Sequence, residues 1–193
     1  MRTERCLALT FDDGPGPYTS ELASVLDRNG ARGTFFVVGN KVRRREDVVR
    51  QLARGGHELA NHSYNHRRTV CRNARAAYRQ IVKTNELLSS TAGVRPRLFR
   101  PPWGLASAEV LAAAQRAGLT PVGWDVDPRD WEAKDPLIVE RRVLGAAGEG
   151  RIVLFHDGEK GEVTLAALPA VLRGLEAQGY RLVTVSELLR LDS

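Results

Sequence analysis

Short apolar runs alternate with longer segments of helical periodicity along the whole sequence. Seven runs have the length and composition of strands, at CLALTF (6–11), GTFFVVG (33–39), HELAN (57–61), RLFR (97–100), TPVGW (120–124), RIVLF (151–155) and YRLVTV (180–185). Strand–helix alternation at this spacing is typical of a parallel sheet with helices packed outside it. About seven such units that close on themselves would form an α/β barrel related to the (β/α)8 form. An open doubly wound sheet is the alternative, but no Gly-x-Gly-x-x-Gly motif supports dinucleotide binding.

Helix boundaries can be predicted from capping residues and glycines. Thr19 or Ser20 is expected to cap a helix that ends at Asn29-Gly30, and a helix over 46–54 is expected to stop at Gly55-Gly56. The remaining helices are expected over 73–89, from Ser107 to Ala117, from Asp135-Pro136, over 165–178 and from Ser186. These helices would separate all the predicted strands.

Length and composition indicate an ordinary globular domain. The 193 residues fit a single domain over 1–193, with 42% hydrophobic and 27% charged residues. No apolar stretch approaches the roughly 20 residues of a membrane span, and no signal peptide is recognisable after Met1, so the sequence leaves localisation open. Cys6 and Cys71 do not make a disulfide framework, and Cys6 is expected to be a small buried apolar residue.

Positive charge is concentrated in one part of the chain. Twelve of the basic residues lie between Lys41 and Lys83, where only three acidic residues oppose them, whereas the net charge of the whole chain is +6. Such a region is either a solvated helix face or a surface that attracts a polyanion, for example a cell-wall polymer. Nucleic acid is the weaker candidate partner, because Tyr64 and Tyr78 are the only aromatic residues available there for base stacking.

Polar residues follow five of the predicted strands at the point where each strand ends. They are Asp12 and Asp13, then His62 and His66, then Arg100 before Pro101-Pro102-Trp103, then Asp127 and Asp130, and finally His156-Asp157. In a parallel barrel the carboxyl ends of all strands meet at one mouth, where catalytic groups lie. The sequence therefore predicts one polar site at that mouth.

A divalent metal explains the two adjacent carboxylates. His62 and His66 are four residues apart and can face the same way, as two imidazole ligands of a transition metal. Asp13 is the natural third ligand, and three protein ligands are typical of a catalytic metal site. His57, in contrast, is expected to have a packing or backbone-bonding role.

The remaining residues suggest a metal-assisted acyl hydrolysis. Asp12 could accept a proton from the attacking water, while Arg100 could hold Asp12 ionised and oriented. His156 could protonate the leaving group, with Asp127 or Asp130 in support. A backbone N–H near Trp103 could stabilise the oxyanion together with the metal.

The motifs TFDDGP, HSYNH, RPPWG, DVDPRDW and LFH resemble the five ordered motifs of the polysaccharide deacetylases, also called the NodB-homology or carbohydrate esterase family 4 domain. This resemblance covers about Leu7 to Leu189 and implies a distorted (β/α)7–8 barrel. It implies a metal held by Asp13, His62 and His66, with zinc expected and cobalt, nickel or manganese as alternatives. By the same resemblance Asp12 is the base, Arg100 orients it, His156 is the acid and Asp130, rather than Asp127, tunes that acid. Leu154 would line the acetyl pocket, Trp131 would wall the groove, and Trp103 stands where tyrosine is common.

Several functions remain open at this stage. The leading hypothesis is an N-deacetylase of N-acetylglucosamine units in chitin-type oligomers or peptidoglycan. An O-acetyl esterase of xylan-like glycans, a deacetylase of a small metabolite, and a metal-free glycan- or nucleic-acid-binding module are the alternatives. We expect a monomer with an acetylated glycan as its substrate, and the resemblance favours a secreted or cell-envelope location.

Overall fold

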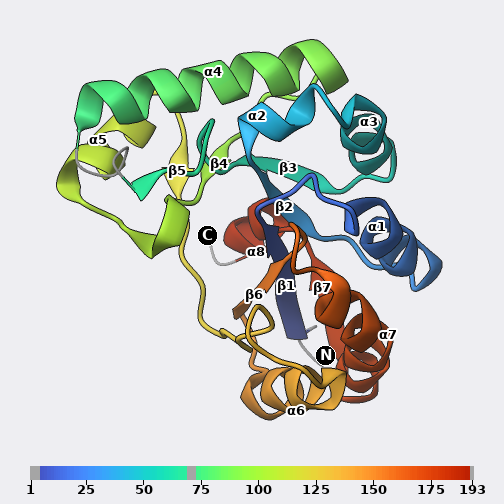
Figure 1. The fold of residues 1–193 in the computed structure, drawn as a ribbon. Helices are drawn as coiled ribbons and strands as arrows, with labels where there is room; N and C mark the ends of the chain where they lie inside the picture. The colour runs from blue at the N-terminus through green and yellow to red at the C-terminus, as the bar shows by residue number, and fades with distance from the viewer. Residues whose placement is uncertain (1–4, 69–72, 192–193) are drawn as a thin grey trace.

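A computed structural model describes residues 5–68 and 73–191. Its seven strands are all parallel and follow the order β5-β4-β3-β2-β1-β6, with β7 also paired to β1. The strands are β1 (Arg5–Asp12), β2 (Thr34–Val37), β3 (Glu58–Asn61), β4 (Leu98–Phe99), β5 (Thr120–Pro121), β6 (Ile152–His156) and β7 (Tyr180–Val183). All seven lie within the predicted runs or extend them by one residue, and Figure 1 shows the sheet surrounded by helices.

The central strand β1 is buried on both faces. Leu7, Leu9 and Phe11 belong to the core cluster shared with the outer helices, whereas Cys6 and Ala8 belong to a second cluster inside the curled sheet. Cys6 and Ala8 are smaller than the outward residues of this strand, and larger side chains such as Phe36 share the interior with them. The expectation that Cys6 is a small buried apolar residue is confirmed.

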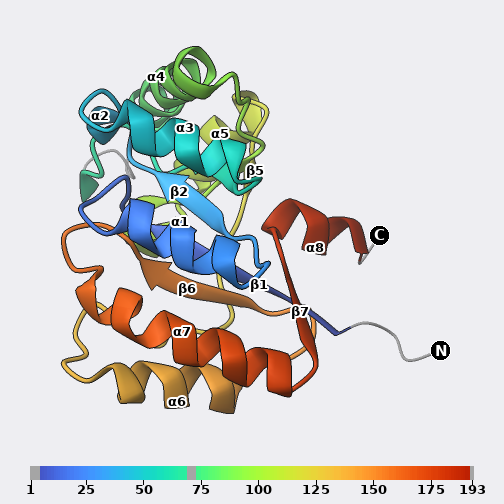
Figure 2. The same ribbon diagram turned by 90° about the vertical axis from the view of Figure 1, so that its right-hand side faces the viewer.

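The helices cover the outside of the curled sheet, except for α8. They are α1 (Thr19–Arg28), α2 (Gly39–Val42), α3 (Glu46–Arg54), α4 (Ala74–Ala92), α5 (Ala108–Arg116), α6 (Pro136–Ala146), α7 (Glu162–Ala177) and α8 (Val185–Leu191), with a 3₁₀ turn η2 at Pro102–Gly104. Figure 2 shows α8 at the end of the molecule where β1 begins, away from the carboxyl ends of the strands. Among the described residues, no helix combines the length and hydrophobicity that a membrane crossing requires.

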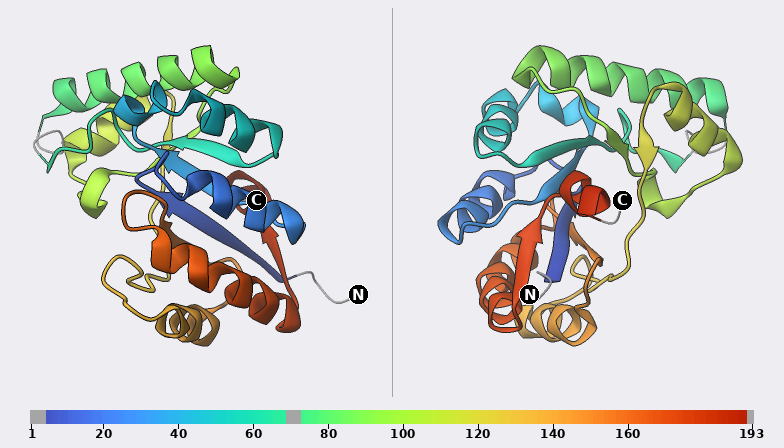
Figure 3. Two further views of the ribbon diagram at one scale, coloured as in Figure 1. Left: turned by 45° about the vertical axis from the view of Figure 1, so that its right-hand side comes forward. Right: turned by 180° about the vertical axis from the view of Figure 1, so that it is seen from behind.

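The barrel is closed by an irregular segment. Val126, in the chain that follows β5, forms a parallel bridge with Val153 of β6, and Leu154 N donates to Val126 O at 2.9 Å. Figure 3 shows this segment running from β5 past the β6 side of the sheet to α6. The prediction of a distorted (β/α)7–8 barrel is therefore confirmed, and an open doubly wound sheet is wrong.

Two predicted caps are present, and two are wrong. Ser107 and Asp135 accept hydrogen bonds from the first turns of α5 and α6. Asn73, expected only as the start of a helix, caps α4 in the same way. Thr19 is instead the first residue of α1, and its hydroxyl bonds to Gly16 and to Asp157.

At α8 the predicted cap Ser186 lies inside the helix and donates to Glu58. Thr184 caps this helix in a capping box with Glu187, whose carboxylate accepts the Thr184 N–H at 2.9 Å. The short helix α2 was not predicted, and Cys71 lies outside the described residues.

Candidate metal centre and active site

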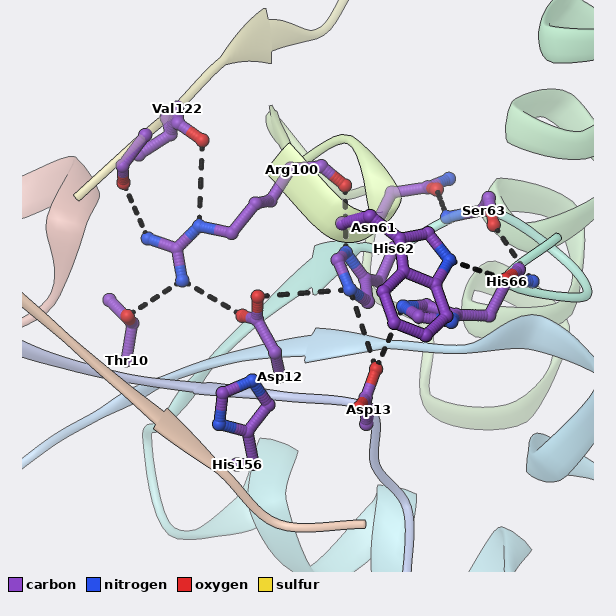
Figure 4. A network of polar contacts seen from close by, with 12 residues as sticks. Thr10, Asp12, Asp13, Asn61, His62, Ser63, His66, Arg100, Val122 and His156 are labelled. Atoms are coloured by element: carbon purple, nitrogen blue, oxygen red, sulfur yellow. Dashed lines mark hydrogen bonds and ion pairs between the residues drawn. The ribbon is translucent and has the colours of Figure 1, made fainter. Parts of the chain in front are cut away.

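The carboxyl ends of the strands open into a pocket of about 480 Å³. Its lining brings together nine of the residues singled out from the sequence, which come from β1, from β6 and from the loops after β1, β3, β4 and β5: Asp12, Asp13, His62, His66, Trp103, Asp127, Trp131, Leu154 and His156. Arg100 lies directly behind Asp12. Figure 4 shows the side chains of Asp12, Asp13, His62, His66, Arg100 and His156 converging from separate elements. A larger groove of about 730 Å³ between α4 and α5 contains none of them.

Asp13, His62 and His66 form a cluster with the donor set of a transition-metal site. Each offers one ligand atom, and the three atoms lie within 4.8 Å of one another. Asp13 Oδ1 lies 3.0 Å from His66 Nε2 and 3.5 Å from His62 Nε2. The geometry therefore brings together the three residues that the sequence suggested as ligands.

Two details of this cluster fit a bound cation. Asp13 Oδ1 is buried and accepts no hydrogen bond from the described residues. His62 Nδ1–H donates to the Arg100 carbonyl at 2.7 Å, which leaves Nε2 free to ligate. Burial by itself raises the pKa of the Asp13 carboxyl, but the neighbouring His62 and His66 imidazoles hold it well below its usual range. A carboxylate and two oriented imidazoles are the chemistry that a divalent transition metal requires.

Asp12 faces the pocket from the last position of β1. The fully buried Arg100 donates from Nη1 to Asp12 Oδ1 at 2.8 Å and to Thr10 Oγ1 at 2.7 Å. Its Nη2 donates to Gly123 O at 2.6 Å, and its guanidinium lies 4.1 Å from the centre of the Phe36 ring. These contacts fix the guanidinium, so Asp12 is held in a single orientation between Arg100 and His62 (Figure 4).

His156 faces the same pocket from the end of β6. Its Nδ1–H donates to Asp130 Oδ1 at 2.8 Å, which leaves Nε2 available for proton transfer. Asp130 also accepts hydrogen bonds from the His156 backbone N–H at 2.7 Å and from Thr164 Oγ1 at 2.5 Å. Burial alone lowers the pKa of His156, but the Asp130 carboxylate overcomes this and raises it to about 9.

Asp127 does not contact His156. It lies exposed on the pocket rim, where its Oδ1 accepts the Arg129 N–H at 2.8 Å. Of the two acids that the sequence left open, Asp130 is therefore the one in contact with His156.

The loops around the pocket contain left-handed backbone. The non-glycine residues with positive φ in the described chain are Asp13, Ser63, His66, Trp103 and Arg129, at 76°, 64°, 55°, 63° and 53°. This conformation is uncommon outside glycine and clusters at functional sites. All five residues belong to the loops that build this site, two of them being candidate ligands.

Trp103, Trp131 and Leu154 line the pocket as predicted, but further lining residues were missed. They are Arg68, Gly104, Trp124 and Lys160. Trp124 packs so closely on Gly104 that a Cβ there would lie 2.8 Å from the indole. Its position just past a strand end was a signal that could have identified it.

Asp157 and His57 have supporting roles. Asp157 is fully buried beside the loop after β1, and a Cβ at Gly14 would collide with its carboxylate at 2.1 Å. Burial, with the nearby Asp13 and Asp12 carboxylates, raises the pKa of Asp157 to about 7 despite a hydrogen bond from Thr19. His57 is buried against Phe35 and accepts the Gly33 N–H, so its expected packing and backbone-bonding role is confirmed.

Comparison with known proteins places the chain in a family. A family model described as "Polysaccharide deacetylase" matches residues 1–122. A peptidoglycan-N-acetylglucosamine deacetylase of Bacillus cereus is 39% identical over 191 residues, which cover 97% of this chain and 89% of that protein. The chain belongs to the polysaccharide deacetylase family. The resemblance inferred from the five motifs is thereby confirmed, and metal dependence is a property of this family.

Other polysaccharide deacetylases align over the same region. The peptidoglycan-N-acetylglucosamine deacetylase PgdA of Listeria monocytogenes is 36% identical over 188 residues, and the chain spans 39% of the length of that relative. The structure of peptidoglycan deacetylase PdaC from Bacillus subtilis superposes with a TM-score of 0.90 at 33% identity, covering 98% of this chain and 92% of that one. The fold is thus that of the family.

Proposed function

We propose that the chain is a metal-dependent hydrolase that removes acetyl groups from N-acetylated glycans. One observation carries the proposal: a candidate metal triad, a carboxylate paired with arginine and a histidine paired with a buried aspartate line a single pocket. A binding module would need neither a proton acceptor nor a proton donor there. The family membership and the names of the relatives support the same function.

The proposed reaction adds water to the acetamide carbonyl and releases acetate and an amine. When bound, a divalent cation lowers the pKa of water and polarises the carbonyl oxygen. Asp12 accepts the proton of the attacking water, and Arg100 keeps Asp12 charged and oriented. His156 donates a proton to the leaving nitrogen, since its pKa of about 9 keeps it protonated at neutral pH.

The pocket walls position the acetyl group in this proposal. Leu154 is almost fully buried beside His156 and offers the apolar surface that a methyl group needs. Trp131 and Trp103 are exposed aromatic residues that flank the opening and can stack against sugar rings. A backbone N–H near Trp103 as an oxyanion donor stays a prediction.

Zinc is the metal we propose for the site. Two imidazoles and one carboxylate suit zinc with an open position for water, although cobalt, nickel or manganese would accept the same ligands. Elemental analysis of the purified protein identifies the bound metal. Removal by chelator should abolish activity, and adding back each metal in turn should rank them.

The decisive experiment is mass spectrometry of acetylated glycans incubated with the protein and zinc, scored for the loss of acetyl groups. We expect loss from N-acetylated oligosaccharides and none after chelation. Loss from O-acetylated xylan-type glycans alone would favour the esterase, and loss only from small amides would favour a metabolite deacetylase. Neither bound metal nor acetate release would favour a binding module.

The proposed proton donor His156 should matter more for hydrolysis of an amide than for hydrolysis of an ester. An amine leaves only when it is protonated, whereas an alkoxide needs less help. We expect His156→Ala to abolish amide hydrolysis while sparing part of any ester hydrolysis. A secreted or cell-envelope location and a monomeric state also remain proposals, measurable by fractionation and by light scattering.

A further inference from the structure

Two cations on the pocket lining take no part in the chemistry proposed above. Arg68 and Lys160 are both exposed, and no carboxylate of the described residues lies within the 4.0 Å of an ion pair with either one. We propose that these two side chains select acetylated glycans that carry carboxylates over neutral glycans of the same length. The inference rests on the proposed deacetylase function and specifies its substrate class.

Arg68 is held on one wall of the pocket by an aromatic stack. Its guanidinium carbon lies 4.6 Å from the centre of the Trp103 ring. Trp103 is itself fixed, because Nε1 donates to His66 O at 3.3 Å and the ring lies 5.0 Å from that of His66. Stacking on an indole uses the face of a guanidinium and leaves its N–H groups free to bind a carboxylate.

Lys160 lies near a second aromatic wall, at a longer distance. Its Nζ lies 6.0 Å from the centre of the Trp131 ring, in the loop that follows His156. Arg129 lies 5.8 Å from the centre of the same ring. Trp131 and Trp103 belong to different loops, after β5 and β4, so the two cations are placed on separate indole walls. A sugar bound between these walls would have a cation near each one.

The other charged lining residues are already engaged. Asp12 pairs with Arg100, Asp13 contacts the two histidines, and His156 pairs with Asp130. Asp127, the remaining acid of the lining, accepts the Arg129 N–H. Arg68 and Lys160 are therefore the charges of this pocket that a substrate anion can satisfy.

Positive charge is also concentrated on the first half of α4. Its basic residues without a carboxylate of the described chain in ion-pair range are Arg75, Arg79 and Lys83. Tyr64 is covered by the Lys83 ammonium at 3.8 Å and Tyr78 by the Arg116 guanidinium at 4.4 Å. Because a cation occupies one face of each ring, these tyrosines are poor platforms for stacking nucleic-acid bases. An anionic glycan therefore fits this region better than nucleic acid.

The test compares two substrates that differ only in charge. A tetrasaccharide of alternating N-acetylglucosamine and N-acetylmuramic acid is prepared with its lactyl carboxylates free or converted to amides. With metal-loaded enzyme, kcat/KM should be higher for the free acid. Arg68→Gln and Lys160→Gln should each lower the ratio of kcat/KM for the acid to kcat/KM for the amide by about twofold to fivefold, which corresponds to the free energy of an exposed charge pair. The double variant should lower this ratio by about tenfold. Raising the ionic strength from about 0.05 to 0.5 M should shrink the preference of the unmodified enzyme.

Matched variants separate charge from shape. Arg68→Lys keeps the charge but not the planar stack and should retain most of the ratio. Arg67→Gln and Lys134→Gln change the same charge on exposed residues that do not line the pocket, and the ratio should stay unchanged.

Each result decides something different. Equal turnover of acid and amide, or a ratio that responds as strongly to Arg67→Gln as to Arg68→Gln, overturns the inference and leaves the deacetylase function standing. Acetate release from neither substrate, nor from neutral chitooligosaccharides, overturns the proposed function and this inference with it.

Discussion

The two sides of the pocket each contain a charged pair, and the two pairs face the pocket in opposite order. Arg100 and Asp12 are joined at 2.8 Å and are both buried, with side-chain exposures of 0% and 6%, and the carboxylate is the partner that lines the pocket. His156 and Asp130 are also joined at 2.8 Å, but there the carboxylate is buried, at 0%, and the imidazole is 20% exposed. One pair presents a base to the pocket and the other an acid.

This inversion explains how one pocket can hold a proton acceptor and a proton donor. In each pair the partner behind the pocket is fixed by further hydrogen bonds. Arg100 donates to Thr10 and Gly123. Asp130 accepts from Thr164 and from the His156 backbone N–H. The partner facing the pocket remains free to exchange a proton. Which partner lines the pocket, rather than residue type alone, assigns the two roles.

The largest effect is expected from breaking the Arg100 side. Arg100→Met leaves the Asp12 charge buried without its partner, so we expect loss of about 3–5 kcal/mol of unfolding free energy and of all measurable activity. Urea denaturation measures the first and acetate release the second. Replacing Asp12 with Leu in the same protein should restore stability but not activity. If Arg100→Met unfolds no more easily than the unmodified protein, the pair does not hold this side of the pocket.

Asp12, the pocket-facing member of that pair, should matter for chemistry more than for folding. Asp12→Asn keeps the shape of the side chain and removes the base, so kcat for deacetylation should fall by about 10²–10⁴-fold. Steady-state kinetics, together with metal analysis, check this. Retention of bound metal shows that the triad is intact, and an unchanged kcat would contradict the role of Asp12.

The His156 side can be broken from its buried partner. Asp130→Asn removes the carboxylate that orients the acid, so kcat should fall by about 10²-fold, whereas Asp127→Asn in the same loop serves as the matched control and should change it little. In the metal-free protein, NMR titration should show the pKa of His156 falling from about 9 to 6.5 or below in Asp130→Asn. Equal effects of the two variants would contradict the contact seen here.

The same pair makes stability depend on pH. The pKa of His156 is about 9 in the folded chain and 6.5 in the unfolded chain, so its contribution to stability is complete below pH 6.5. That contribution is lost as pH rises toward 9, because the folded state then gives up its extra proton. Denaturation curves between pH 6 and 10 should show the decline in the metal-free unmodified protein and a weaker one in Asp130→Asn.

The smallest effect is expected at the support of Asp130. Thr164→Val removes a hydroxyl that donates to Asp130 Oδ2 at 2.5 Å, which should cost about 1 kcal/mol of stability and lower kcat only a few-fold. Thr164→Ser keeps the hydroxyl and should behave like the unmodified protein. A loss as large as that of Asp130→Asn would mean that the hydroxyl, and not the carboxylate charge, positions His156.

Local sequence patterns were sufficient for the strands, most helices and the candidate ligands. The caps at Ser107 and Asp135 were predicted correctly because each bonds to its own helix. Those predicted at Thr19 and Ser186 were wrong because these hydroxyls bond to Asp157 and Glu58, which are distant in the sequence. The metal ligands could be predicted because His62 and His66 are neighbours and strand ends meet at one mouth.

The tertiary structure decided which polar residues touch. Residue chemistry and spacing do not separate Asp127 from Asp130, although the motif resemblance favoured Asp130. The left-handed turn at Arg129 together with the packing of this loop on β6 selects Asp130 for His156. The same loop closes the barrel through a bridge to Val153 that no strand pattern predicts. Local periodicity reports burial along one element, whereas the partner of a buried charge depends on which distant backbone lies within hydrogen-bonding reach. The sequence alone thus determined the elements and the chemistry available to them, and the fold determined the pairs that set each charge.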